Sequence, residues 1–180
     1  NNMALILVGD FDTEAAKPLI EKTFGKLQAR PLPQRTQYPT TAFSQDERYS
    51  AKLGYMPELY IAYNGVPVGD KDELLLDFLG EILSNSMQIG LLDELTLDNK
   101  LMYAGAMNDI RRDQGRFIVV AVPYMDAETQ TYTSLKETEK LVNEVIQQLV
   151  SGTISEELVE AVRQNFYQEF DRTMEYPAMK

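Results

Sequence analysis

Hydrophobic residues recur at helical spacing in several long stretches of this chain. In residues 70–83 the apolar side chains stand three and four positions apart, which is typical of an amphipathic helix with one face in a core. Asp70 precedes this run and Glu73 follows three residues later, the arrangement of a reciprocal capping box. The same spacing predicts further helices at residues 12–24, around 89–95, near 135–150, and from Ser155 onwards.

The first helical stretch has its own start and stop signals. Asp12 or Thr13 is suited to cap it, and Gly25 follows its last apolar residue. Pro18 lies inside the stretch, so we expect a kink or a late helix start there. Residues 26–46 then carry Pro31, Pro33 and Pro39 without periodicity, which predicts an extended connection.

Short apolar or alternating runs predict the strands. Residues 3–8 are continuously apolar and end at a Gly-Asp pair, which favours a buried strand. Residues 48–55 alternate between apolar and polar side chains, the period of a half-buried strand, and residues 59–63 would be its partner. Residues 101–108 and 116–122 are predicted as two strands of a hairpin with a charged tip.

The resulting order is strand, helix, two strands, helices, two strands, helices. It favours an α+β fold in which helices pack on one face of an antiparallel or mixed β-sheet. A chain of 180 residues is long enough for one substantial core, so we expect one domain over residues 1–180. The chain opens with Asn1-Asn2-Met3, which suggests a piece of a longer protein.

Composition excludes several kinds of chemistry. The chain has no histidine and no cysteine, so it lacks imidazole or thiolate metal ligands, a histidine general base and disulfides. The formal net charge of -11 would repel a phosphate backbone, which argues against a nucleic-acid partner. No apolar run approaches the roughly 20 residues of a membrane-spanning helix. Cysteine usage does not place the compartment.

Charged clusters offer little further chemistry. Asp70, Asp72 and Glu73 are the densest carboxylates, but acids at a helix start usually interact with the helix dipole. Glu156 and Glu157 have the same position at another helix. Arg111, Arg112 and Arg116 surround a predicted hairpin tip, where charges are usually solvated. Phosphate-loop, dinucleotide and local serine-nucleophile motifs are absent, and a serine–lysine dyad assembled from distant positions stays an open alternative. We therefore predict no catalytic, cofactor-binding or metal-binding residue in this chain.

The order of segments resembles a known family. Met3-Ala-Leu-Ile-Leu-Val-Gly-Asp-Phe-Asp and the following helix that ends in Phe24-Gly25 are similar to a strand and helix of pitrilysin/insulinase-family zinc peptidases. The resemblance continues through Leu59-Tyr-Ile-Ala-Tyr63, residues 70–83, Leu91-Leu-Asp-Glu-Leu95 with Tyr103, Gly115-Arg-Phe-Ile-Val-Val119, and the C-terminal helices. In that family, tandem α+β domains enclose unfolded peptide, and only one carries the zinc motif. Because histidine is absent here, the resemblance implies a non-catalytic domain.

This resemblance implies partners and contacts. The expected partners are unfolded peptide and a zinc-bearing catalytic domain, in the same polypeptide or in a partner subunit. Tyr103 matches a peptide-holding tyrosine of some members, although Thr96 stands where they carry an arginine. Ala104, Gly105, Ala106 and Met107 resemble a strand that pairs with substrate; alternatively, Gly105 only relieves crowding in the sheet. Bacterial relatives point to the periplasm or cell envelope.

Two alternatives remain open at this point. The chain could be a structural subunit domain of the same fold without a peptidase partner. It could also be an unrelated α+β ligand-binding domain, which would have a closed apolar pocket instead of an open concave face.

Overall fold

The computed structural model describes residues 4–28, 30–31, 33–36 and 45–175. The chain divides into two compact units, residues 1–39 and residues 40–180. A single domain over residues 1–180 stays a prediction. No helix within the described ranges is long and apolar enough to cross a membrane.

The first unit contains helix α1 (Thr13–Phe24). Asp12 caps it as predicted, because its carboxylate accepts hydrogen bonds from the backbone N–H groups of Glu14 and Ala15 at 2.8 and 3.0 Å. Gly25 ends the helix, its N–H donating to the carbonyl of Glu21. Pro18 lies inside α1, which begins at Thr13, so the alternative of a late helix start is wrong.

The predicted buried strand at residues 3–8 is wrong for the part that the structure describes. Residues 4–8 have no regular structure, and Ile6 is 80% exposed. An apolar run forms a strand only where a neighbouring strand pairs with its backbone, and the described part of the first unit contains no strand that could pair with residues 4–8. Met3 lies outside the described residues, as do residues 29, 32 and 37–44 of the predicted connection.

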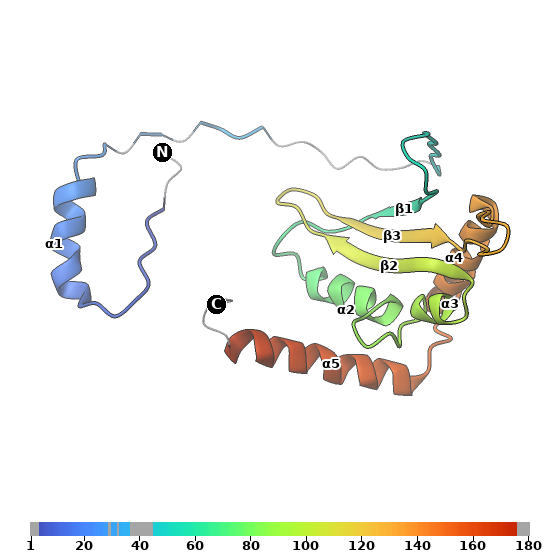
Figure 1. Cartoon of the computed structure of the whole chain (residues 1–180). Coiled ribbons are helices and arrows are strands. Elements are labelled where there is room, and N and C mark those ends of the chain that lie inside the picture. Colours follow the sequence, from blue (N-terminus) through green and yellow to red (C-terminus); the bar gives the residue numbers. More distant parts are fainter. Residues whose placement is uncertain (1–3, 29, 32, 37–44, 176–180) are drawn as a thin grey trace. The chain divides into compact units, whose positions relative to one another are not determined.

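The second unit is built on a three-stranded antiparallel sheet (Figure 1). Its strands are β1 (Leu59–Asn64), β2 (Leu101–Asp109) and β3 (Arg116–Pro123), in the order β1-β3-β2. The predicted hairpin of β2 and β3 is confirmed. Residues 48–55, by contrast, form no strand and Tyr49, Leu53 and Tyr55 are exposed. Alternation does not specify a partner, and β1 pairs with β3 instead.

The described part of this unit also contains four helices, all near predicted positions: α2 (Glu73–Leu83), α3 (Asp93–Leu97), α4 (Leu135–Val150) and α5 (Glu156–Glu175). Helix α2 begins three residues later than predicted. Its Glu73 carboxylate accepts from the N–H of Gly69, while the Asp70 carboxylate accepts from the N–H of Asp72 at 3.0 Å. Both acids therefore order the chain before the helix.

The core lies between one face of the sheet and the helices. In the second unit, Ala104 of β2 and Phe117, Val119 and Ala121 of β3 join a buried cluster with residues of α2, α3, α4 and α5. Figure 1 shows α2 and α3 along one side of the sheet, with α5 beside α2. The predicted α+β fold with helices on one face of an antiparallel sheet is confirmed.

Candidate functional site

Strand β2 forms one edge of the sheet and contains all five residues predicted to contact peptide. Tyr103, Ala104, Gly105, Ala106 and Met107 pair with residues 118–122 of β3. In an antiparallel strand, alternate residues direct their N–H and C=O groups to opposite sides. Since none of the described strands pairs with the second side of β2, half of these backbone groups are directed away from the sheet.

The five residues lie on two faces of the strand. Ala104 is buried in the core and Ala106 packs against it. Tyr103, Gly105 and Met107 alternate with them and therefore lie on the opposite face, which we call the open face. Tyr103 is 51% exposed and Met107 49% exposed, so the open face presents an aromatic ring and a thioether beside the unpaired edge.

Tyr103 and Gly105 are in contact across the open face. A Cβ atom at position 105 would lie 2.6 Å from the Tyr103 hydroxyl oxygen and 3.1 Å from the ring atom Cζ. Only glycine accepts the ring in this position without a shift. The two alanines point into the core, and the space above Gly105 holds the Tyr103 ring.

Tyr60 of β1 extends the open face on the other side of the central strand. Tyr60 and Gly105 are both register partners of Val120, so their positions share one face of the sheet. The Tyr60 hydroxyl donates to the Glu58 carboxylate at 2.7 Å, and this hydrogen bond raises the pKa of the phenol. Sequence reasoning missed Tyr60. Its position between Leu59 and Ile61, whose side chains face the core, places the Tyr60 side chain on the other face of the strand.

Other candidate residues have ordinary partners. Asp109 pairs with Arg111 at 2.8 Å and with Arg116 at 3.3 Å, so two of the three arginines at the hairpin bind a carboxylate of their own chain. Thr96 lies in α3, and its hydroxyl donates to the carbonyl of Leu92 at 3.5 Å. No group of three potential metal ligands occurs among residues 4–28, 30–31, 33–36 and 45–175.

Comparisons with known proteins agree with this architecture. A family model described as the peptidase M16 inactive domain matches residues 1–166. The crystal structure of a protease from Helicobacter pylori is similar, with a TM-score of 0.72, 20% identity and 96% of this chain covered. This chain spans 41% of that protease. A likeness at this identity shows the fold. No curated protein sequence matches this chain.

Proposed function

Because this chain belongs to the family of peptidase M16 inactive domains, we propose that it encloses and aligns unfolded peptide for a zinc-dependent catalytic domain. That catalytic domain lies in the same polypeptide or in a partner subunit and supplies the zinc, since this chain has neither histidine nor cysteine. Under this proposal the chain contributes no group to bond cleavage.

The observation that carries the proposal is the edge of β2 that no described strand pairs with, beside the open face. An extended peptide can add to such an edge as a fourth strand, and its main-chain hydrogen bonds do not depend on its sequence. This mode suits unfolded peptides, whose backbone N–H and C=O groups are free to pair. Peptide side chains on the open face would lie against Tyr103 and Met107, within reach of cross-strand contacts.

Tyr103 contributes contact area in this arrangement. Thr96 replaces the arginine with which the equivalent tyrosine acts in some relatives, so the charge-assisted bond, on the order of 1.5–3 kcal/mol, is missing. An aromatic ring next to a pairing edge still contacts side chains of many kinds. We therefore propose general retention of peptide by this strand, without stabilisation of a transition state.

N-methyl scanning of a long peptide substrate of the full-length parent protein tests this mode. Each N-methyl group removes one peptide N–H, so strand addition predicts a rise in KM at every second methylated position along the part that contacts β2. The rise should be about five- to tenfold per position, the worth of one lost hydrogen bond. Equal effects at neighbouring positions would contradict pairing with a strand edge.

Gly105→Val in the parent protein tests which strand is involved. The valine must displace the Tyr103 ring and crowd the edge, so KM should rise for long peptides and stay unchanged for peptides too short to reach β2. Ala62→Val is the matched control, because Ala62 is an exposed residue on the open face of the opposite edge strand, β1. Equal KM changes in the two folded variants would contradict a role for β2.

Family membership excludes one of the two alternatives raised by the sequence. An unrelated ligand-binding domain is wrong, because the family match covers 166 of 180 residues. A structural subunit domain of the same family predicts that neither N-methylation nor Gly105→Val alters peptide turnover by the assembled protein.

A further inference from the structure

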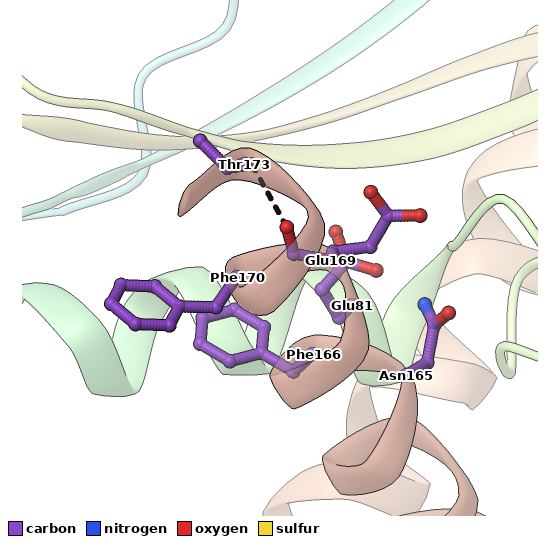
Figure 2. A pocket seen from close by; sticks show the side chains of 6 residues that line it. All are labelled: Glu81, Asn165, Phe166, Glu169, Phe170 and Thr173. Atoms are coloured by element: carbon purple, nitrogen blue, oxygen red, sulfur yellow. Dashed lines mark hydrogen bonds between the residues drawn. The ribbon is translucent and has the colours of Figure 1, made fainter. Parts of the chain in front are cut away.

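A second candidate site lies in the groove between α2 and α5, which the peptide-retention proposal does not use (Figure 2). The groove has a volume of about 200 Å³ and opens to solvent. It is lined by Glu81, Asn165, Phe166, Glu169, Phe170 and Thr173. Glu81 comes from α2 and the other five residues come from α5.

Two carboxylates give this groove an excess of negative charge. The half-buried Glu81 carboxylate has no hydrogen bond and no ion pair within the described part of the chain. Its pKa is raised by burial and then by the negative charges of Glu169, Asp93 and Asp77. Figure 2 shows the Glu81 and Glu169 carboxylates beside each other. Arg172 reaches one oxygen of Glu169 at 3.3 Å, so one of the two carboxylates already pairs with a positive charge.

The rest of the groove is aromatic, with one polar group. Phe170 is 60% exposed, while Phe166 packs edge-on against Phe78 with ring centroids 6.0 Å apart. The side-chain amide of Asn165 is half-buried and has no hydrogen-bond partner among the described residues. The groove therefore offers an aromatic surface, two carboxylates and a free amide within one concavity.

We propose that this groove binds an arginine side chain presented by a segment of a partner polypeptide. A guanidinium has five N–H donors in one plane, enough to reach both carboxylates and the Asn165 carbonyl. Its flat face stacks on an aromatic ring such as Phe170. The net charge of -11 on the whole chain would attract a basic segment, and the two carboxylates of the groove define where it docks.

The test measures binding of a fluorescent hexapeptide, acetyl-Leu-Arg-Ala-Leu-Arg-Ala-amide, to the 180-residue chain at low and physiological salt. The matched peptide carries citrulline, the neutral isostere of arginine, at both positions. We expect the arginine peptide to bind about tenfold more tightly than the citrulline peptide, as for a lost charge-assisted bond. Equal affinities would overturn the proposal, and equal binding of a lysine peptide would overturn its preference for arginine.

Two glutamine variants distinguish binding in the groove from attraction by the overall negative charge of the chain. Glu81→Gln should weaken binding of the arginine peptide about tenfold. Glu144→Gln removes the same charge from an exposed position on α4 and should change the affinity by less than about twofold, as expected for a remote screened charge. Similar losses in the two variants would overturn the groove as the site.

Phe170→Ala is a second variant that keeps all charges. It should weaken the arginine peptide by about three- to tenfold through the lost cation–π contact, and an unchanged affinity would overturn stacking on Phe170. Circular dichroism and thermal unfolding of each variant establish that it is folded before binding is compared.

Discussion

The phenol ring of Tyr103 lies over the backbone of Gly105, two residues further along β2, so close that a Cβ atom at position 105 would be 2.6 Å from its hydroxyl oxygen. The glycine leaves the strand without a side chain at this point, and the ring covers the space that results. The contact between Tyr103 and Gly105 therefore fixes the packing of the open face next to the edge of β2 that is proposed to bind peptide.

This contact predicts a dependence between the two residues in a double-mutant cycle. In the wild-type background Gly105→Ala must displace the ring, and we expect a loss of about 0.5–1 kcal/mol of unfolding free energy. In a Tyr103→Ala background the same change should stabilise by about 0.5 kcal/mol, because alanine loses less backbone entropy than glycine on folding. Urea denaturation of the four proteins should give a coupling of about 1–1.5 kcal/mol. A coupling near zero would contradict the contact.

A second effect on stability is expected from Asp93, the first residue of α3, whose carboxylate binds the loop between α2 and α3. It is only 7% exposed, and its carboxylate accepts hydrogen bonds from the Ser84 hydroxyl and from the backbone N–H groups of Asn85 and Gly90, at 2.9–3.0 Å. Asp93→Ala leaves these donors without an acceptor and should cost about 3 kcal/mol. Urea denaturation measures the loss.

The matched control is Asp98→Ala, which removes an exposed carboxylate that pairs with Lys100 just after α3. It should leave the urea midpoint nearly unchanged, because exposed ion pairs contribute little. If both variants shifted the midpoint equally, Asp93 would not organise the loop.

The apolar periodicity of the sequence predicted helices and strands correctly where all the signals for an element lie within one contiguous segment. The helices beginning at Thr13, Leu135 and Glu156 were predicted because their apolar residues recur at helical spacing within one stretch. The first and the last of them also had a start signal, at Asp12 or Thr13 and at Ser155. The β2–β3 hairpin was predicted for a similar reason, since both strands and their turn are contiguous. The five candidate residues were correctly assigned to a strand by the same local pattern.

The pairing of strands that are distant in the sequence could not be predicted from the sequence. Residues 4–8 and 48–55 have side-chain patterns typical of strands, yet the structure gives them no strand partner among the described residues. Tyr60 of β1 shares the open face with certain residues of β2. Which residues these are depends on how β1 and β2 each pair with the central strand β3. The groove between α2 and α5 likewise joins residues more than 80 positions apart, such as Glu81 and Glu169.

Zinc content is a further expected outcome. The purified 180-residue chain should contain no stoichiometric zinc after dialysis, because it offers only oxygen ligands and zinc in proteins prefers imidazole and thiolate. Elemental analysis of the chain measures this directly. The chain together with its proposed catalytic domain or subunit, analysed in parallel, should carry zinc and lose peptidase activity with a chelator. One tightly held zinc ion per isolated chain would contradict the assignment.

The last prediction concerns the pH dependence of α2–α5 packing. Burial and the neighbouring carboxylates raise the pKa of Glu81 above its ordinary value of 4.5, so the folded state disfavours the ionised form. The resulting loss of stability is fully present above the folded-state pKa and disappears as the pH falls towards 4.5. Glu81→Gln should therefore raise the Tm at pH 7 and have a smaller effect near pH 4.5.

Thermal unfolding of both proteins across this pH range measures the difference, with Glu144→Gln as the control for a change in net charge. Glu144 is exposed on α4 and its side chain lies near Lys140 at 3.9 Å, so its removal should not raise the Tm at pH 7. The decisive quantity is the Tm gain of Glu81→Gln over Glu144→Gln, which should shrink as the pH falls. A gain that stays constant with pH would show that the effect comes from side-chain packing, since only an ionised Glu81 carries the electrostatic penalty.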